Sequence, residues 1–150
     1  MKRFNIRVYG LCVEQGRILL SDEVRMGIHM TKFPGGGVEF GEGLEAALHR
    51  EWMEELGVSI EVGEILYVNP FLQISAFHPD DEIIAMYFRV HLKGTIVGRL
   101  SEIPQDFDNR PGDQQVLRWE LLEHLRPEAL TFPIDQSLIR HLPRLFPENF

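Results

Sequence analysis

Three carboxylates lie close together in a segment that has the period of a helix. The segment REWMEELG contains Glu51, Glu54 and Glu55. At about 100° per residue, Glu51 and Glu55 fall on the same stripe as Leu44 and Leu48, and Glu54 lies on its border. A stripe of this kind normally packs against a sheet. We therefore expect its first half to be buried and its second half to carry the three carboxylates into a cleft.

Such a cluster is unfavourable without positive charge, because carboxylates one turn apart repel each other and lose hydration when they are buried. Arg50 can offset one of these negative charges but not all of them. Carboxylates on one helix face suit Mg²⁺ or Mn²⁺, which prefer oxygen ligands and keep several water molecules. The segment therefore predicts a divalent-metal site. The alternative is a solvated acidic face, which is the usual state of a Glu-rich helix.

The residues before the helix extend this pattern. From Gly36 the chain continues with five residues, Glu42, seven residues and then REWMEELGV. This spacing resembles the signature of the Nudix hydrolases and covers residues 36–58. The matching positions are Gly36, Glu42, Arg50, Glu51, Glu54, Glu55, Gly57 and Val58. The one departure is Trp52, where the family usually has Ile, Leu or Val, so we expect altered packing there without loss of chemistry.

The resemblance implies a fold and an activity. The fold is α/β (α+β): an α/β/α sandwich with a mixed β-sheet between helices, in one domain over residues 1–150. The activity is metal-dependent hydrolysis of the pyrophosphate bond in a nucleoside diphosphate derivative. The substrate would be a nucleoside triphosphate, ADP-ribose or a nucleotide sugar, or a dinucleoside polyphosphate. The alternative is a non-catalytic nucleotide-sensing or regulatory module with the same fold; loss of a box acid would favour it, and none is lost.

The resemblance also suggests how Mg²⁺ or Mn²⁺ is held. Glu51 and Glu55, one turn apart, are the best candidates for metal ligands. The family resemblance of the preceding segment FPGG places the carbonyl of Gly35 near the metal as well. Glu42 is a candidate for binding or positioning a second metal ion.

For the catalytic groups, the box offers two residues. Glu54 is either a third metal ligand or the base that takes a proton from the attacking water. Arg50 is expected to orient a box glutamate through a charge-assisted hydrogen bond. Many family members add an acid from a later loop, and Asp113 in RPGDQQVLRW is the first candidate, unless it only shapes the turn after Pro111. The rival acids are Asp106, Asp108, Glu102 and Glu82.

Three basic residues are candidates for binding the substrate's phosphates, namely Arg7, Arg25 and Lys32. Position along the chain does not choose among them. The expected partner is a small nucleotide-type molecule, with no duplex nucleic acid and no membrane. A homodimer is a possible assembly.

The elements that position these residues follow from hydrophobic period and turn signals. Strand-like runs cover residues 4–13 and 18–24, and Gly16 between them favours a β-hairpin. We expect no regular element in the glycine-rich KFPGGGVEFGEG. A helix is predicted over residues 44–56, and Gly57 is a suitable residue to end it.

The second half of the chain predicts further strands and a closing helix. Strand-like runs cover residues 60–75 and 83–92. A polar loop is expected over residues 98–114, followed by a strand in QQVLRWELL. The last helix is predicted over residues 134–142.

Composition limits the classes of protein that fit. The 150 residues are enough for one domain with its own core. The net charge of −8 disfavours duplex nucleic acid and anionic membrane surfaces as partners. The single cysteine, Cys12, permits no internal disulfide, and we expect it in the core. The start MKRFNIRV lacks the apolar stretch of a signal peptide, and together these features predict a cytoplasmic protein.

Overall fold

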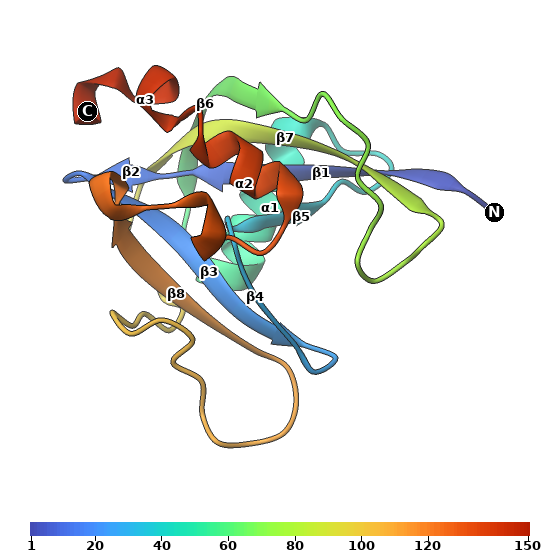
Figure 1. The fold of residues 1–150 in the computed structure, drawn as a ribbon, viewed down its shortest axis with the longest axis horizontal. Helices are drawn as coiled ribbons and strands as arrows, with labels where there is room; N and C mark the ends of the chain where they lie inside the picture. Colours follow the sequence, from blue (N-terminus) through green and yellow to red (C-terminus); the bar gives the residue numbers. More distant parts are fainter.

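The first sheet has β1 and β7 as its inner strands, as the computed structural model of residues 1–150 shows (Figure 1). Its strand order is β5-β1-β7-β6, with bounds of Gly35–Gly37, Arg3–Leu11, Asp81–Leu92 and Ile60–Val68. β1 and β7 are parallel, and the outer strands β5 and β6 are antiparallel to their neighbours. The sheet is therefore mixed, as predicted.

The second sheet is built on β3, which covers Arg17–Arg25. β3 pairs antiparallel with β2 (Val13–Glu14), β4 (Ile28–Lys32) and β8 (Gln114–Leu121). Its residues alternate between two core clusters, with Leu19 in one cluster and Ile18 and Leu20 in the other. This alternation shows that both faces of the strand are covered.

Helices cover both sides of the strands (Figure 1). α1 (Leu44–Leu56) packs on one core cluster, and α2 (Pro133–Ile139) and α3 (Leu142–Leu145) pack on the other. In Figure 1, α2 lies in front of the strands and α1 behind them. The predicted α/β/α arrangement is thus confirmed. Short 3₁₀ turns complete the chain at Leu122–His124, Pro127–Ala129 and Pro147–Asn149.

The helix that carries the box has the predicted bounds. It ends at Gly57, whose φ of 65° and N–H bond to the carbonyl of Met53 form a left-handed cap. With 13 residues it is the longest helix, and none of the helices combines the length and apolar character needed to cross a membrane.

The structure corrects two predictions about the first half of the chain. The hairpin at Gly16 forms, but the strand that pairs with β3 in it is the short β2. The long strand β1, which we expected in this hairpin, pairs with β5 and β7 instead. The glycines 35–37 form a strand, although we expected no regular element there. A Cβ at Gly35 would lie 2.1 Å from the carbonyl oxygen of Val8, so only glycine permits this close pairing with β1. β4 was not predicted; positive φ angles at Met26 and Gly27 turn the chain into it.

Two boundaries in the second half also differ from the prediction. β6 ends at Val68 because the side chain of Asn69 then bonds to β7, accepting the N–H of Ala85 at 2.8 Å. The predicted helix over residues 134–142 is interrupted after Ile139 and resumes as α3. Pro143 explains this break, since it has no N–H to donate within a continuous helix.

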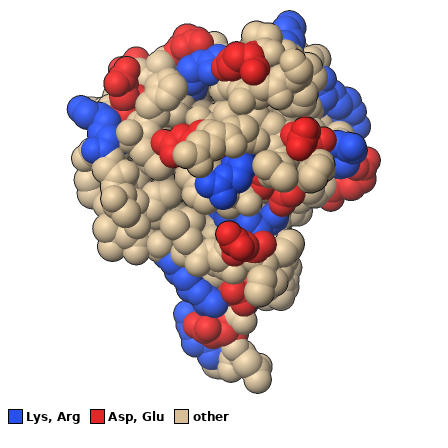
Figure 2. All heavy atoms as spheres, turned by 90° about the vertical axis from the view of Figure 1, so that its left-hand side faces the viewer, with Lys and Arg blue, Asp and Glu red and all other residues tan.

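Charges on the surface are mixed in sign. On the face that Figure 2 shows, acidic and basic side chains are interspersed, and no basic patch extends across it.

Candidate active site

The carboxylates of α1 lie at the edge of its buried face. Glu51 and Glu55 are half-buried, whereas the side chain of Glu54 is 58% exposed. The centre of the buried face is formed instead by Ala47, Leu48, Trp52 and Leu56. Trp52 and Leu56 thus take the centre of the face against the sheet, and the carboxylates that we expected in a cleft lie along its border.

Arg50 holds several box residues together. It donates to both carboxylate oxygens of Glu42, at 3.0 Å from Nε and 2.6 Å from Nη2. Its Nη1 donates to Glu51 at 3.0 Å and to Glu54 at 3.4 Å, and its Nη2 also donates to the carbonyl of Gly37 at 3.0 Å. The hydrogen bonds from Arg50 lower the pKa of the Glu42 carboxyl to about 2. Arg50 thus ties the helix to the loop before it and to β5.

The box glycine Gly36 makes room for one of these carboxylates. A Cβ at this position would lie 2.4 Å from the carboxyl carbon of Glu51, closer than any real contact. Because Gly36 belongs to β5, the carboxylate of Glu51 lies directly against the backbone of the sheet. A side chain at position 36 would displace it.

Glu55 faces a set of polar residues of which the sequence singled out only Lys32. Gln115 donates to Glu55 at 3.3 Å and to the hydroxyl of Ser21 at 2.8 Å, and Ser21 donates in turn to Glu23 at 2.8 Å. Glu23 pairs with Lys32 at 3.5 Å, and both side chains are buried. The only sequence signal was the polar run Ser21, Asp22 and Glu23 within an otherwise apolar strand.

The electrostatics of this set leave negative charge uncompensated. Burial raises the pKa of the Glu55 carboxyl to about 7, and the nearby carboxylates of Glu23 and Glu51 add to the shift, while Lys32 opposes it. A cation bound here would relieve the repulsion between these groups.

The donor set fits a hard divalent cation by its chemistry. Carboxylates and backbone carbonyls are the ligands that Mg²⁺ and Mn²⁺ prefer. In the structure, however, no three His, Cys, Asp or Glu side chains converge so that they could hold a metal ion together. Glu51 and Glu54 are engaged by Arg50, and Glu55 accepts from Gln115. Metal binding would require these side chains to exchange partners.

A polar cleft adjoins the helix and contains Asp113. The cleft is lined by Glu23, Arg25, Glu55, Asp113, Gln114 and Gln115. The carboxylate of Asp113 accepts the N–H of Met26 at 3.1 Å, so it also stabilises the turn between β3 and β4. Its rivals lie elsewhere: Asp106 and Asp108 pair with Arg99, and none of the four rival acids lines the cleft.

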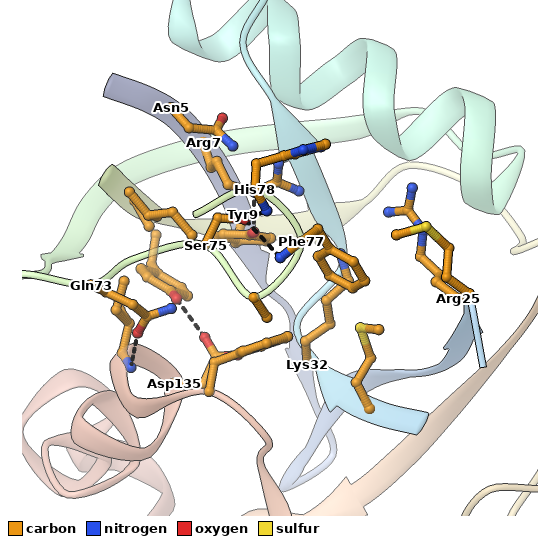
Figure 3. Close-up of a pocket in the computed structure, with 18 residues that line it drawn as sticks. Asn5, Arg7, Tyr9, Arg25, Lys32, Gln73, Ser75, Phe77, His78 and Asp135 are labelled. Atoms are coloured by element: carbon orange, nitrogen blue, oxygen red, sulfur yellow. Dashed lines mark hydrogen bonds between the residues drawn. The ribbon is translucent and has the colours of Figure 1, made fainter. Parts of the chain in front are cut away.

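Next to the cleft lies an aromatic cavity of about 160 Å³, enclosed by β1, β4, β7, the segment 73–78 and the start of α2 (Figure 3). The structure brings Arg7, Arg25 and Lys32 together in its lining. Arg7 donates to the hydroxyl of Tyr9 at 2.5 Å, and the ammonium of Lys32 lies 5.5 Å from the centre of the Tyr9 ring. Arg25 lines both the cleft and the cavity, so the two hollows adjoin each other at this residue.

The far side of the aromatic cavity carries an acid that the sequence did not indicate. The hydroxyl of Tyr87 donates to the buried carboxyl of Asp135, at the start of α2 (Figure 3). Burial raises the pKa of Asp135 to about 6. Gln73 accepts the N–H of Ile134 at 3.0 Å and closes the same side. A single acid in a terminal helix has no spacing signal that would identify it.

Solved structures with this fold include several hydrolases. The solution structure of the Escherichia coli ORF135 protein has a TM-score of 0.72 and 22% identity, covering 96% of this chain and 91% of that one. A MutT NUDIX hydrolase from Burkholderia pseudomallei has a TM-score of 0.66 and 27% identity, covering 91% and 97%. An ADP-ribose pyrophosphatase from Streptococcus suis has a TM-score of 0.59 and 13% identity, covering 96% and 90%.

At the sequence level, the chain is 41% identical over 49 residues to the RNA pyrophosphohydrolase of Escherichia coli. That match covers 33% of this chain and only 27% of the relative. A family model described as the NUDIX domain matches residues 1–142. Since this match takes in nearly the whole chain, the protein belongs to the NUDIX domain family.

Proposed function

We propose that this protein is a Mg²⁺- or Mn²⁺-dependent pyrophosphohydrolase that acts on a nucleoside diphosphate derivative. One observation carries the proposal. The half-buried carboxylate of Glu55, one helical turn from Glu51, lines a polar cleft that adjoins, at Arg25, a cavity with cationic and aromatic side chains. These surroundings suit a substrate whose pyrophosphate lies in the cleft near the metal and whose organic group lies in the aromatic cavity.

In this proposal Glu51, Glu55 and the carbonyl of Gly35 hold the metal, and Glu54 is either a third carboxylate ligand or the general base. A bound divalent cation supplies charge stabilisation at the phosphates and acidifies a water molecule. Arg50 keeps Glu51 oriented through its hydrogen bond of 3.0 Å.

Two acids are available to take the proton from the attacking water. Glu54 is exposed and can turn towards the cleft, and Asp113 already lines it. We keep both as candidates for the general base, since either position allows access to a water molecule in the cleft.

Arg7, Arg25 and Lys32 would neutralise the phosphates, and the nucleoside would occupy the aromatic cavity. Its lining includes the ring of Tyr9, which stacks on the buried Tyr87, and the half-buried ring of Phe77, which can stack on a planar base. A volume of about 160 Å³ suits one small group better than a polymer. The net charge of −8 and the mixed charges in Figure 2 likewise favour a free nucleotide in the cytoplasm over an RNA chain. A homodimer is compatible with this proposal.

The test is hydrolysis of a substrate panel: nucleoside triphosphates, ADP-ribose, a nucleotide sugar and a dinucleoside polyphosphate, each with Mg²⁺ and with Mn²⁺. Phosphate, pyrophosphate and nucleotide release should be measured separately, because together they identify the bond that is cleaved. We expect turnover of at least one compound only when metal is present. Nucleotide binding without release of any product would instead support a non-catalytic module.

A further inference from the structure

Trp52, the one departure from the box pattern, contacts the glycine segment directly. Its side chain is wholly buried, and its indole Nε1–H donates to the carbonyl oxygen of Pro34 at 3.2 Å. The N–H of Gly10 in β1 donates to the same oxygen at 2.9 Å. The carbonyl of the residue before Gly35 is therefore held by two elements, α1 and β1.

Gly10 provides the space that the indole needs. A Cβ at this position would lie 2.5 Å from Cζ2 of Trp52 and 2.9 Å from Cγ2 of Val90. Gly10 does not have a positive φ, so the requirement is for space and not for an unusual backbone conformation. Trp52 and Gly10 thus form a matched pair, in which a large side chain fills the room left by a missing one.

The same turn of α1 also contacts β5 on the other side of Gly35. Glu51 precedes Trp52, and its carboxylate lies against Gly36. Gly35 is thereby flanked by a contact from each of two successive helix residues. Because a peptide unit is planar, a fixed Pro34 carbonyl also fixes the nitrogen and Cα of Gly35, which as a glycine has the most freedom to lose.

We propose that Trp52 is a positioning residue: its indole N–H orients the Pro34–Gly35 peptide, and with it the Gly35 carbonyl, relative to the carboxylate of Glu51. This inference rests on the proposed metal-dependent function. An Ile, Leu or Val at position 52 could fill the core, but it has no N–H to donate to Pro34.

Trp52→Phe tests the hydrogen bond, because it removes the donor and keeps a buried ring. Mn²⁺ affinity, measured from the electron paramagnetic resonance signal of free Mn²⁺, should fall about fivefold, as expected for one lost hydrogen bond. The kcat should fall while the KM for the nucleotide is unchanged. Ile60→Val, in the same core cluster, is the matched control, with a lower Tm and unchanged Mn²⁺ affinity.

A second variant separates packing from hydrogen bonding. Trp52→Leu also lacks the donor, but it leaves a void beside Gly10 that the ring of Trp52→Phe largely fills. We expect the Tm of Trp52→Leu to lie below that of Trp52→Phe, whereas both variants should have the same reduced Mn²⁺ affinity. An Mn²⁺ affinity that falls in step with Tm across the two variants, or wild-type Mn²⁺ affinity in Trp52→Phe, would overturn the role of the indole N–H. A wild-type protein that neither binds Mn²⁺ nor hydrolyses any nucleotide would overturn the proposed function, and this role with it.

Discussion

Neighbouring residues of β3 show two ways of burying an acid. Asp22 is wholly buried and fully paired: it accepts from Arg118 at 2.9 Å, from Thr31 at 2.7 Å and from the N–H of Gln105 at 3.0 Å. Burial alone would raise its pKa, but the hydrogen bonds from Arg118 and Thr31 outweigh burial and hold the pKa below its usual value. This acid needs no further partner.

Glu23 points to the opposite face, where acids outnumber cations. Lys32 is its buried partner, and the same lysine also opposes the raised pKa of Glu55. Arg50, another nearby cation, is held mainly by Glu42, and Arg25 is the one cation that faces Glu23, Glu55 and Asp113 in the cleft. One face of β3 therefore carries a buried acid whose charge is balanced and stabilises the fold, whereas the other face keeps unbalanced negative charge that a bound cation can neutralise.

The largest change in stability should come from breaking the buried pair of Asp22 and Arg118. Arg118→Leu leaves Asp22 buried without its cation, which should lower the free energy of unfolding by about 3–5 kcal/mol. Urea denaturation measures this loss. Replacing both residues by leucine should recover much of it, since no isolated charge is left. A loss below about 1 kcal/mol in the single variant would contradict the view that Asp22 depends on Arg118.

On the opposite face of β3, removing a carboxylate should reduce activity without reducing stability. Glu55→Gln should reduce kcat at least about 100-fold, because a lost metal ligand removes several kcal/mol of charge stabilisation. The metal-free variant should unfold at the same temperature as the wild type or higher, since like-charge repulsion is relieved. Hydrolysis within threefold of wild type would show that Glu55 is not a ligand.

Asp135 extends the comparison to the aromatic cavity. Its pKa of about 6 in the folded protein exceeds the ordinary value of 3.8, so the folded state favours the protonated form. This contribution to stability is complete below about pH 4 and is lost as the pH rises through about 6. Lys32 and Arg7 oppose the shift but do not cancel it.

Asp135→Asn should therefore remove one component of the pH dependence. Relative to wild type, the variant should gain roughly 2 kcal/mol in the free energy of unfolding between pH 4 and pH 7. Asparagine keeps an oxygen that can accept from Tyr87, which limits other effects. Denaturation curves at several pH values measure the difference. Parallel pH profiles for the two proteins would mean that Asp135 does not titrate in this range.

The parts of the molecule that the sequence predicted are those governed by local spacing. The bounds of α1, its cap at Gly57 and the box follow from residues within a few turns of one another. The surroundings of Glu55 depend instead on long-range pairing: Ser21 and Gln115 are 94 residues apart and meet because β3 pairs with β8. The residue pattern of neither strand alone predicts which residues of β3 and β8 lie opposite each other.

The position of the carboxylates was only partly predictable for a related reason. The helical period correctly placed Glu51 and Glu55 beside Leu48. Which side chain lies at the centre of the buried face depends, however, on what packs against the sheet. Trp52 fills it because Gly10, 42 positions earlier in the chain, leaves the space. Asp135 likewise gains its environment only when α2 packs over Tyr87.

The most direct test of the central claim, that the carboxylates of α1 form a metal site, is the change in Tm on adding Mn²⁺. At about 100 times Kd, binding to the folded state contributes about 2.7 kcal/mol, which raises the Tm of a domain of this size by several degrees. Glu51→Gln/Glu55→Gln should lose the shift, because neutral amides are poor ligands for hard cations. Glu45→Gln/Glu61→Gln, which changes two exposed glutamates, should keep it. Equal shifts in all three proteins would contradict the claim and place the metal elsewhere.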